Sequence, residues 1–399
     1  MMRIFLNGLG ANTASGLTYL RNVLVHLGRW KDVHTTVAVI PKLKAEFAAI
    51  AGIDIAELPC PGGALRRFWF EQRRLPEFLQ RTRADVLISA GNFALRKCPV
   101  PQILLSGNSL YISRDFYRDL LSRGEYAMWL NTRVRAAFAR QSIHWADCTV
   151  APTCAFAEDL ERWSGRPVIT IRHGFDRDIF FAGKSPLPEN VRLALEEAQD
   201  ALRLLYVSHY NYFRNFETLL RAVPVLRQRL RGRKLRVFLT CKLAAKKTSG
   251  SYDPRTAAAL VKQLGICDEI VELGEVPYRC LHQLYSACHV YVSPSYAETF
   301  AHPLVEARAC GLPLVVSDLP VHREVCGDAA LYFSRFSHEQ LAECILRSGG
   351  SRTSGSLLRD ATVSVTFSWR AHVQQILLQA ARLTGQDIGV VEEAIGRPA

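Results

Sequence analysis

Two glutamates stand on either side of a short loop that leads from an apolar strand to a helix. Glu298 follows the run 290–293, and Glu306 lies about one turn into a helix that begins near Pro303. Proline is tolerated in a first helical turn because the N–H that it lacks has no partner there. The helix start offers unpaired N–H groups and partial positive charge, which suit a diphosphate. The two carboxylates therefore bracket an anion site, where each can accept hydrogen bonds from sugar hydroxyls.

The spacing of the two acids also has an ordinary explanation. The helix dipole favours acidic residues in a first turn without any ligand. Two glutamates at one fixed spacing are expected by chance about once in a chain of this length. The wider pattern around them is more specific, and it consists of Pro294, Ser295, Glu298, Pro303, Leu304, Glu306, Ala307, Gly311, Pro313 and Asp318, continued by Glu324 and Gly327-Asp328-Ala329.

This pattern closely resembles the donor-site region of retaining glycosyltransferases of family 4, also described as glycosyl transferases group 1. The resemblance covers residues 146–383 well and the first 145 residues only in layout. It implies an α/β protein of GT-B architecture, with two Rossmann-like doubly wound domains facing across a cleft. It also implies transfer of a hexose-type sugar from a nucleotide diphosphate sugar with retention of configuration.

The resemblance assigns roles to individual residues. Glu298 and Arg214 are implied to be catalytic, the acid near the transferred sugar and the cation on the leaving phosphates. Glu306 is implied to bind the donor ribose. The further donor-binding candidates are His209, Asn215, Thr299, Phe300, Ala301, His302, Pro303, Leu304, Val276 and Gly274. His209 stands where the family has arginine, so either the grip on the donor is weaker or another arginine replaces it.

The acceptor side is less well marked. Gly8, Gly10 and Gly16 lie in or beside a loop after the first strand, similar to the glycine loop of the family. The family's catalytic-face histidine has no clear equivalent. Asn92 and Asn108 both follow strands where it would stand, and Asn108 is taken as the candidate. In the segment 171–176, which resembles the loop ending the family's first domain, we expect Gly174 at a position that tolerates positive φ.

Strands and helices alternate along the chain, which predicts parallel sheets covered by helices. A Gly- and Pro-rich stretch near residue 181 predicts a break between domains. We therefore predict an acceptor domain at 1–180, a linker at 181–200 and a donor domain at 201–368. A helix at 369–385 is expected to cross back to the first domain, followed by a tail at 386–399. Apolar spacing over 114–143 predicts a long helical stretch with many arginines.

Composition narrows the class of protein and of partner. The 399 residues are 49% hydrophobic and 22% charged, which is ordinary for a globular protein. The net charge of +13 favours anionic partners. The densest basic stretch, 221–247, lacks the interleaved aromatics of single-strand nucleic-acid sites, so we expect a solvated face and no nucleic acid. Eleven scattered cysteines and no signal peptide predict reduced thiols in a cytoplasmic protein, with Cys241 and Cys288 as buried apolar residues.

No Asp-x-Asp pattern stands at a strand end, so we expect no metal and no cofactor other than the nucleotide sugar as co-substrate. The acceptor is expected to be a glycan or a lipid-linked sugar in cell-surface polysaccharide assembly. The mixed segment 66–74, rich in Arg and aromatics, either rests on an anionic membrane at the inner face of the plasma membrane or packs its aromatics inward. A nucleotide-sugar epimerase or phosphorylase on the same fold, or a catalytically idle binding module, remain alternatives.

Overall fold

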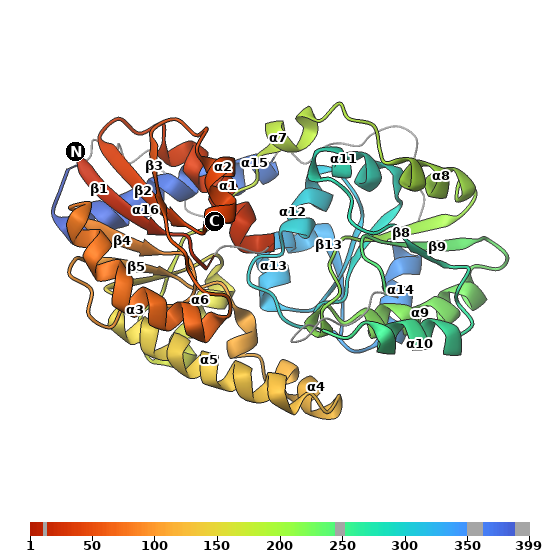
Figure 1. The fold of residues 1–399 in the computed structure, drawn as a ribbon. Helices are drawn as coiled ribbons and strands as arrows, with labels where there is room; N and C mark the ends of the chain where they lie inside the picture. Colours follow the sequence, from red (N-terminus) through yellow and green to blue (C-terminus); the bar gives the residue numbers. More distant parts are fainter. Residues whose placement is uncertain (11–13, 244–251, 349–361, 388–399) are drawn as a thin grey trace. The chain divides into compact units, whose positions relative to one another are not determined.

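The protein is described here by a computed structural model that covers residues 1–10, 14–243, 252–348 and 362–387. The chain divides into two compact units (Figure 1). The first contains Met1–Ile112, Leu130–Gly174 and the chain from Phe367, and the second contains Ser113–Trp129 and Phe175–Thr366. Each unit has one parallel sheet with helices, so the predicted α/β class with two Rossmann-like domains is confirmed. Their predicted placement about a cleft stays a prediction.

The sheet of the first unit has the strand order β3-β2-β1-β4-β5-β6-β7, and every neighbouring pair is parallel. Its strands are β1 (Met2–Asn7), β2 (Val33–Val39), β3 (Ile53–Glu57), β4 (Val86–Ser89), β5 (Gln102–Leu105), β6 (Cys148–Ala151) and β7 (Ile169–Thr170). Chain order reverses between β1 and β4. This is the switch point of the sheet, where the loops that follow two adjacent strands diverge and leave room for a ligand.

Helices that alternate with these strands belong to the first unit. They are α1 (Ala14–Leu27), α2 (Pro41–Phe47), α3 (Ala64–Arg81), the 3-10 turn η1 (Ser109–Tyr111), α6 (Cys154–Ser164), α16 (Trp369–Thr384) and most of α5 (Tyr126–Trp145). The strands are short apolar runs, as expected where both faces of a parallel sheet are covered. Helix α16 places Trp369, Val373 and Leu377 in the same core as Ile4 and Leu6 of β1, so the end of the chain completes the first unit.

The second unit repeats this plan with the strand order β10-β9-β8-β11-β12-β13, again parallel throughout. Its strands are β8 (Leu202–Tyr206), β9 (Leu235–Leu239), β10 (Ile270–Glu272), β11 (Val290–Ser293), β12 (Leu314–Ser317) and β13 (Ala330–Phe333). Here the chain order reverses between β8 and β11. The loops after these two strands are the ones that the sequence predicts to hold the donor.

The helices of the second unit include three that come before its first strand. In chain order they are α4 (Arg114–Ser122), α7 (Arg177–Ala182), α8 (Glu189–Glu197), the 3-10 turn η2 (Tyr212–Arg214), α9 (Phe216–Arg229), α10 (Arg255–Gln263), α11 (Tyr278–Ala287), α12 (His302–Ala309), α13 (Pro320–Cys326), the 3-10 turn η3 (Gly327–Ala329), α14 (His338–Arg347) and α15 (Thr362–Thr366). Cys241 and Cys288 are buried, as predicted.

The boundary between the units differs from the predicted one in two places. The predicted linker at 181–200 is largely helical and packs on the second unit: the Asn190 side chain donates to the Leu273 carbonyl (3.2 Å), and Gln283 donates to that of Ser185 (2.7 Å). The chain instead passes between units at Gly174–Phe175. Residues 113–129, placed by prediction in the acceptor domain, group with the second unit. Among the described residues, no helix has the length and apolar character needed to cross a bilayer.

Candidate functional site

The switch point of the second sheet brings the two predicted catalytic residues together. Arg214 ends the turn after β8, and Glu298 lies in the loop after β11. The Arg214 Nη1 donates to Oε1 of Glu298, and to the Ser295 hydroxyl at 3.4 Å. Only 7% of the Glu298 side chain is exposed, against 23% for Arg214. A cation and a carboxylate thus meet where parallel sheets bind ligands.

The two loops that carry this pair are tied to each other by further bonds. The amide of Tyr296 donates to the carbonyl of Phe213 at 3.0 Å, and the Tyr206 hydroxyl donates to the carbonyl of Arg214 at 2.8 Å. Asn215 has a left-handed backbone (φ 55°), and its amide donates to the carbonyls of Pro294 (3.0 Å) and Arg335 (2.6 Å). This predicted donor-binding residue is buried, and its side chain joins the loop after β8 to the segments at Pro294 and Arg335.

Helix α12 begins one residue before the predicted Pro303, after a left-handed Ala301 (φ 63°). The backbone N–H groups of residues 299–304 are predicted to hold a diphosphate. One of them, the N–H of Leu304, already donates to the Ala301 carbonyl at 2.9 Å. Phe300 is buried, and its ring lies 4.7 Å from that of His302 between centroids. Burial lowers the pKa of His302 to about 4, so this ring is neutral at pH 7. Thr299 is half-buried at the same turn.

Glu306 lies in the second turn of α12 and is buried. The Tyr285 hydroxyl of α11 donates to its Oε2 at 2.8 Å and also approaches the Pro303 carbonyl at 3.3 Å. Burial raises the pKa of Glu306 to about 7, and the Tyr285 bond opposes that rise. A carboxylate accepts several hydrogen bonds, so Glu306 keeps capacity for a pair of hydroxyls beside the one from Tyr285. Tyr285 was not foreseen, because a tyrosine in an apolar helix pattern is indistinguishable from a core residue.

The predicted base-recognition loop follows β10. Gly274 has φ 79°, a conformation that favours glycine, and Val276 is buried. Lys242 crosses this loop: its ammonium group donates to the carbonyl of Glu272, and its Cε would lie 3.3 Å from a Cβ at Gly274. Lys242 was not among the predicted site residues. It stands three residues after the end of β9 and is the last described cation of the basic stretch. His209 is exposed beside the Arg214 turn.

Comparison with known families now identifies this region. The family model of the glycosyl transferases group 1 matches residues 189–348. This part of the second unit is a glycosyl transferases group 1 domain. The predicted family resemblance is therefore confirmed, and it falls on the segment that carries Arg214, Glu298 and Glu306.

Individual relatives agree with the family model. The D-inositol 3-phosphate glycosyltransferase of Corynebacterium aurimucosum is 27% identical over 253 residues, 61% of this chain and 59% of that protein. The O-antigen chain mannosyltransferase RfbU of Salmonella typhimurium is 41% identical over 73 residues, 18% of this chain and 21% of that protein. The matched regions thus span less than two thirds of these relatives' own lengths.

A solved structure extends the likeness over the whole fold. Anabaena HepE in complex with UDP and glucose is similar with a TM-score of 0.67 at 16% identity, covering 96% of this chain and 100% of that chain. Similarity at this level of identity shows a shared fold alone, and the predicted GT-B fold is confirmed.

In the first unit, the predicted glycine loop lies at the β1–β4 switch point. A Cβ at Gly8 would come within 2.9 Å of the Ala38 carbonyl oxygen, and one at Gly10 within 2.6 Å of the Arg67 guanidinium. Glycine is therefore required here by close approach. Arg67, on α3, donates to the Gly91 carbonyl (3.0 Å) and pairs with Glu71 (3.3 Å), which is 2% exposed. Burial raises the pKa of Glu71 to about 7 although Arg67 lowers it.

The other acceptor-side candidates have structural partners. Gly16 lies inside the first turn of α1, beyond residues 11–13 of the loop, which are outside the described residues. The Asn108 side chain caps η1 by accepting from the Leu110 amide at 3.1 Å. The Asn92 side chain accepts from the Gly107 amide at 2.8 Å, which places the two asparagine loops next to each other. Neither residue is singled out as a catalytic group by these contacts.

Gly174 does not have the predicted positive φ. A Cβ there would lie 2.1 Å from the Trp369 backbone nitrogen, so its role is to allow close approach of α16. His173 packs beside the same tryptophan, with ring centroids 5.4 Å apart. The start of α16 therefore packs against residues 173–174 within the first unit.

Proposed function

We propose that the protein is a glycosyltransferase that binds a nucleotide diphosphate sugar at the β8–β11 switch point and transfers the sugar with retention of configuration. The observation that carries the proposal is the Arg214–Glu298 pair, which stands at this switch point within a glycosyl transferases group 1 domain. The names of the relatives, each a sugar transferase, point to the same activity.

The proposed chemistry assigns charge stabilisation to Arg214. When the bond between the anomeric carbon and the diphosphate oxygen breaks, negative charge grows on the leaving nucleoside diphosphate. A guanidinium has several N–H donors in a fixed fork, so Arg214 can bind a phosphate while it keeps its bond to Glu298. A positioned cation that binds where charge develops lowers the barrier to the reaction. Glu298 holds the guanidinium and places a carboxylate beside the transferred sugar.

The remaining donor contacts follow from the same geometry. Glu306 binds the ribose hydroxyls, the start of α12 lies against the diphosphate, and the Gly274–Val276 loop with Lys242 lies at the base. Arg214 and Lys242 supply cations in a site where the family arginine is replaced by His209. The acceptor is proposed to be a glycan or lipid-linked sugar in polysaccharide assembly, held from the first unit.

Nucleotide binding tests the proposal most directly. We expect UDP, GDP or ADP to raise the unfolding temperature of the protein, and Glu306→Gln to remove most of that shift. Assays with the matching nucleotide sugars and membrane or glycan extracts should then release nucleoside diphosphate, and NMR of the product should show the retained anomer. EDTA should leave the rate unchanged, as expected for a transfer without metal.

Two outcomes would replace the proposal. Conversion of a nucleotide sugar to its epimer with no acceptor present identifies an epimerase on this fold. Tight nucleotide-sugar binding with no transfer to any extract identifies a binding module. Absence of a shift with all three nucleotides would contradict donor binding itself.

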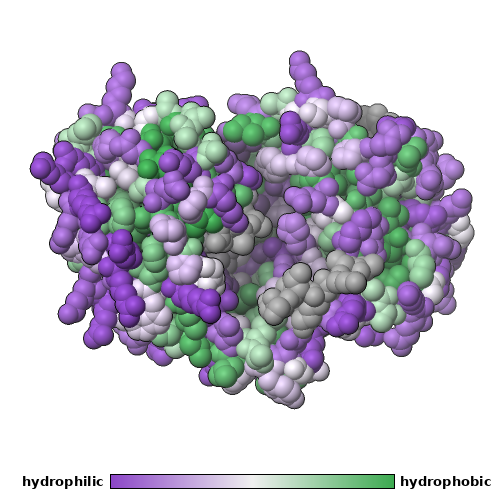
Figure 2. Space-filling view, in the orientation of Figure 1, coloured by the Kyte–Doolittle hydropathy of each residue, from purple (hydrophilic) through white to green (hydrophobic). Residues whose placement is uncertain are grey.

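Peripheral contact with an anionic membrane is also proposed, on the exposed face of α3 and α5. Phe68 is buried, as the inward-packing alternative predicts, but Trp69 is 53% exposed, and Arg66 and Arg73 are exposed on the same face of α3. Apolar residues reach the surface over α5 beside hydrophilic ones over α3 (Figure 2). Helix α5 exposes Leu130 and contains no acidic residue. Aromatic rings flanked by arginines suit the interface of an anionic bilayer.

Liposome flotation tests this contact. The protein should float with vesicles of phosphatidylglycerol and phosphatidylcholine and remain at the bottom with phosphatidylcholine alone. Trp69→Ala combined with Arg73→Gln should reduce flotation, while Lys42→Gln, an exposed cation on α2, should not. Equal flotation of the double variant would contradict the assignment of this face.

A further inference from the structure

A segment from the first half of the sequence is built into the second unit. We call residues 113–129 the α4 arm; it comprises α4 and the start of α5, separated at Gly124 (φ 70°). The Ser113 hydroxyl caps α4 by accepting from the Phe116 amide at 3.2 Å. Phe116 and Leu120 are buried, and the Phe116 ring lies 6.4 Å from that of Phe213 between centroids. The arm is therefore packed against the turn that carries Arg214.

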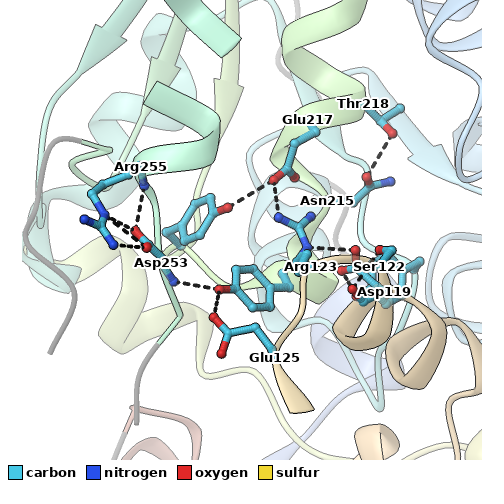
Figure 3. A network of polar contacts seen from close by, with 12 residues as sticks. Asp119, Ser122, Arg123, Glu125, Asn215, Glu217, Thr218, Asp253 and Arg255 are labelled. Atoms are coloured by element: carbon cyan, nitrogen blue, oxygen red, sulfur yellow. Dashed lines mark hydrogen bonds and ion pairs between the residues drawn. The ribbon is translucent and has the colours of Figure 1, made fainter. Parts of the chain in front are cut away.

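Arg123 is the centre of the polar contacts between the arm and the rest of the unit (Figure 3). Its Nε donates to Asp119 Oδ1 at 2.7 Å, and its Nη1 donates to Glu217 Oε1 at 2.9 Å. The guanidinium carbon also lies 4.3 Å from the centroid of the Tyr212 ring. Burial lowers the pKa of Arg123, but the charges of Glu217 and Asp119 outweigh this and raise it above the ordinary range. This arginine remains charged, paired and fixed in one place.

The arm reaches both loops of the candidate donor site. The Tyr296 hydroxyl donates to Asp119 Oδ2 at 2.7 Å, and the Tyr212 hydroxyl donates to Glu125 Oε1 at 2.8 Å. Tyr296 stands two residues before Glu298, and Tyr212 stands two residues before Arg214. Asp119 thus uses one carboxylate oxygen for Arg123 and the other for the Glu298 loop.

A third contact reaches the same site from Arg335, which follows β13. Arg335 Nη2 pairs with Asp115 Oδ2 at 2.8 Å, and the Arg335 carbonyl accepts from the Asn215 side chain at 2.6 Å. Asp115, Asp119, Arg123 and Glu125 are all charged residues of the arm, and each contacts a segment next to a candidate donor-site residue. A helix that served only to cover apolar surface would not need its charges directed at these particular segments.

We propose that the α4 arm is a positioning element of the donor site, in which Asp119 and Arg123 hold the Tyr212–Arg214 turn and the Tyr296–Glu298 loop at the spacing that donor binding requires. The proposal rests on the proposed function, because it assigns a role relative to the donor. None of the arm residues is a catalytic residue, since each acts through another side chain: Tyr212, Glu217, Tyr296 or Arg335.

Three substitutions each remove one chemical group from the contacts between the α4 arm and the donor-site loops. Tyr296→Phe removes only the hydroxyl that binds Asp119, Asp119→Asn removes the charge while it keeps an amide of the same shape, and Arg123→Lys keeps the charge but loses the planar fork. The matched control is Arg118→Gln on the outer face of the same helix, because the Arg118 side chain is 79% exposed and its pair with Asp115 spans 4.0 Å.

The readout is the dissociation constant for UDP, measured by calorimetry on the full chain well below its unfolding temperature, with GDP and ADP measured in parallel. We expect Tyr296→Phe and Asp119→Asn to weaken binding of the preferred nucleotide about three- to tenfold, which corresponds to one lost hydrogen bond. Both changes act on the bond between Tyr296 and Asp119, and Asp119→Asn also weakens the contact with Arg123. The double variant should therefore bind no more weakly than Asp119→Asn alone. Arg123→Lys should weaken binding at least as much, and Arg118→Gln should leave it unchanged.

The outcomes separate this proposal from the one on which it rests. If the unmodified protein binds none of the three nucleotides, both proposals are overturned. If it binds one of them and the three arm variants bind equally tightly, even with lowered unfolding temperatures, donor binding stands and the arm serves stability alone. Weakened binding in the arm variants without weakening in the control supports the positioning role.

Discussion

The two sheets place an arginine and a glutamate at their switch points in different ways. In the second unit, Arg214 and Glu298 come from the two loops that follow β8 and β11, so each side chain belongs to a different wall of the site. In the first unit, Arg67 and Glu71 lie one turn apart on α3. Arg67 meets the loops at the backbone of Gly10 and Gly91, and its guanidinium carbon lies 5.5 Å from the centroid of the Phe93 ring. In the proposed function, the pair in the second unit presents its charges to the donor, whereas the pair in the first unit holds two glycine loops.

Exposure of the two pairs supports this distinction. The side chains of Arg214 and Glu298 are 23% and 7% exposed, against 13% for Arg67 and 2% for Glu71. A buried charge that loses its partner is strongly destabilising, but a partly solvated one is compensated by water. The pair in the first unit should therefore matter for folding and the pair in the second unit for activity.

The largest expected effect is on the stability of the first unit. Glu71→Leu leaves the buried Arg67 without its counter-charge and should lower the free energy of unfolding by about 3 to 5 kcal/mol. Urea unfolding followed by circular dichroism measures this at pH 8, where Glu71, with a pKa of about 7, is mostly ionised. The double variant Arg67→Met with Glu71→Leu should recover most of the loss, since two apolar side chains replace the pair. A single variant as stable as the parent would remove the proposed scaffold role.

The second prediction concerns the matching acid of the second unit. Glu298→Gln should lower kcat for sugar transfer about 100- to 1000-fold, the usual consequence of removing a preorganised electrostatic group. Its unfolding free energy should fall by less than that of Glu71→Leu, because Arg214 reaches solvent and retains its contact with Ser295. Steady-state kinetics with the donor identified by nucleotide binding, together with the same urea titration, provide both values. The reverse pattern, full activity with a large stability loss, would make the two switch points alike.

A third comparison uses the pH dependence of donor binding. Burial raises the pKa of Glu306 to about 7, so this carboxyl is mostly protonated at pH 6 and must lose its proton before it can accept hydroxyl hydrogen bonds as a carboxylate. The affinity for an intact nucleotide sugar, whose diphosphate does not titrate here, should therefore fall about tenfold from pH 8 to pH 6. Calorimetry across this range measures the change, and Glu306→Gln should give a weak, pH-independent value.

Raising the pH should strengthen donor binding at Glu306 but lower the stability of the fold, because Glu306 and Glu71 are both buried acids with raised pKa values. The pKa of Glu71 is also raised to about 7 by burial. A carboxyl whose pKa is raised in the folded state contributes stability that is present below its unfolded pKa and is lost as pH rises to its folded pKa. Unfolding free energy should thus decline between about pH 4.5 and pH 7, and Glu306→Gln should flatten part of that decline. A rise over this window would show that the buried acids are already charged.

The candidate site of the second unit was a prediction from local features of the sequence. A strand end, a proline at a helix start and two acids lie within one short segment, so neighbours along the chain are also neighbours in space. The positions of Arg214 and Glu298 needed one further inference, that loops after adjacent parallel strands lie together. The family pattern supplied it.

Other features depend on contacts that sequence spacing does not encode. The apolar spacing of 114–143 predicts helix correctly, but it does not tell which unit the charged face of α4 contacts. Gly124, where the helix divides, was the available signal. In the sequence, Glu71 stands among the arginines of α3 and would be taken for an exposed acid. In the structure it is buried. Gly174 suggested a turn, whereas its partner Trp369 comes from the far end of the chain.

The smallest expected effect tests why the first unit needs glycine at its switch point. Gly10→Ala places a methyl group 2.6 Å from the Arg67 guanidinium and 2.9 Å from the Gly91 Cα. The guanidinium can shift, but the Gly91 backbone cannot do so freely, so we expect a loss of about 1 kcal/mol, at the low end of overpacking effects. Gly62→Ala is the control, because a Cβ there meets nothing within 4 Å and its φ is not positive. Equal unfolding free energies for the two variants would mean that the glycine loop is not held by Arg67, and the contrast between a side-chain site and a backbone site would then lose its structural basis.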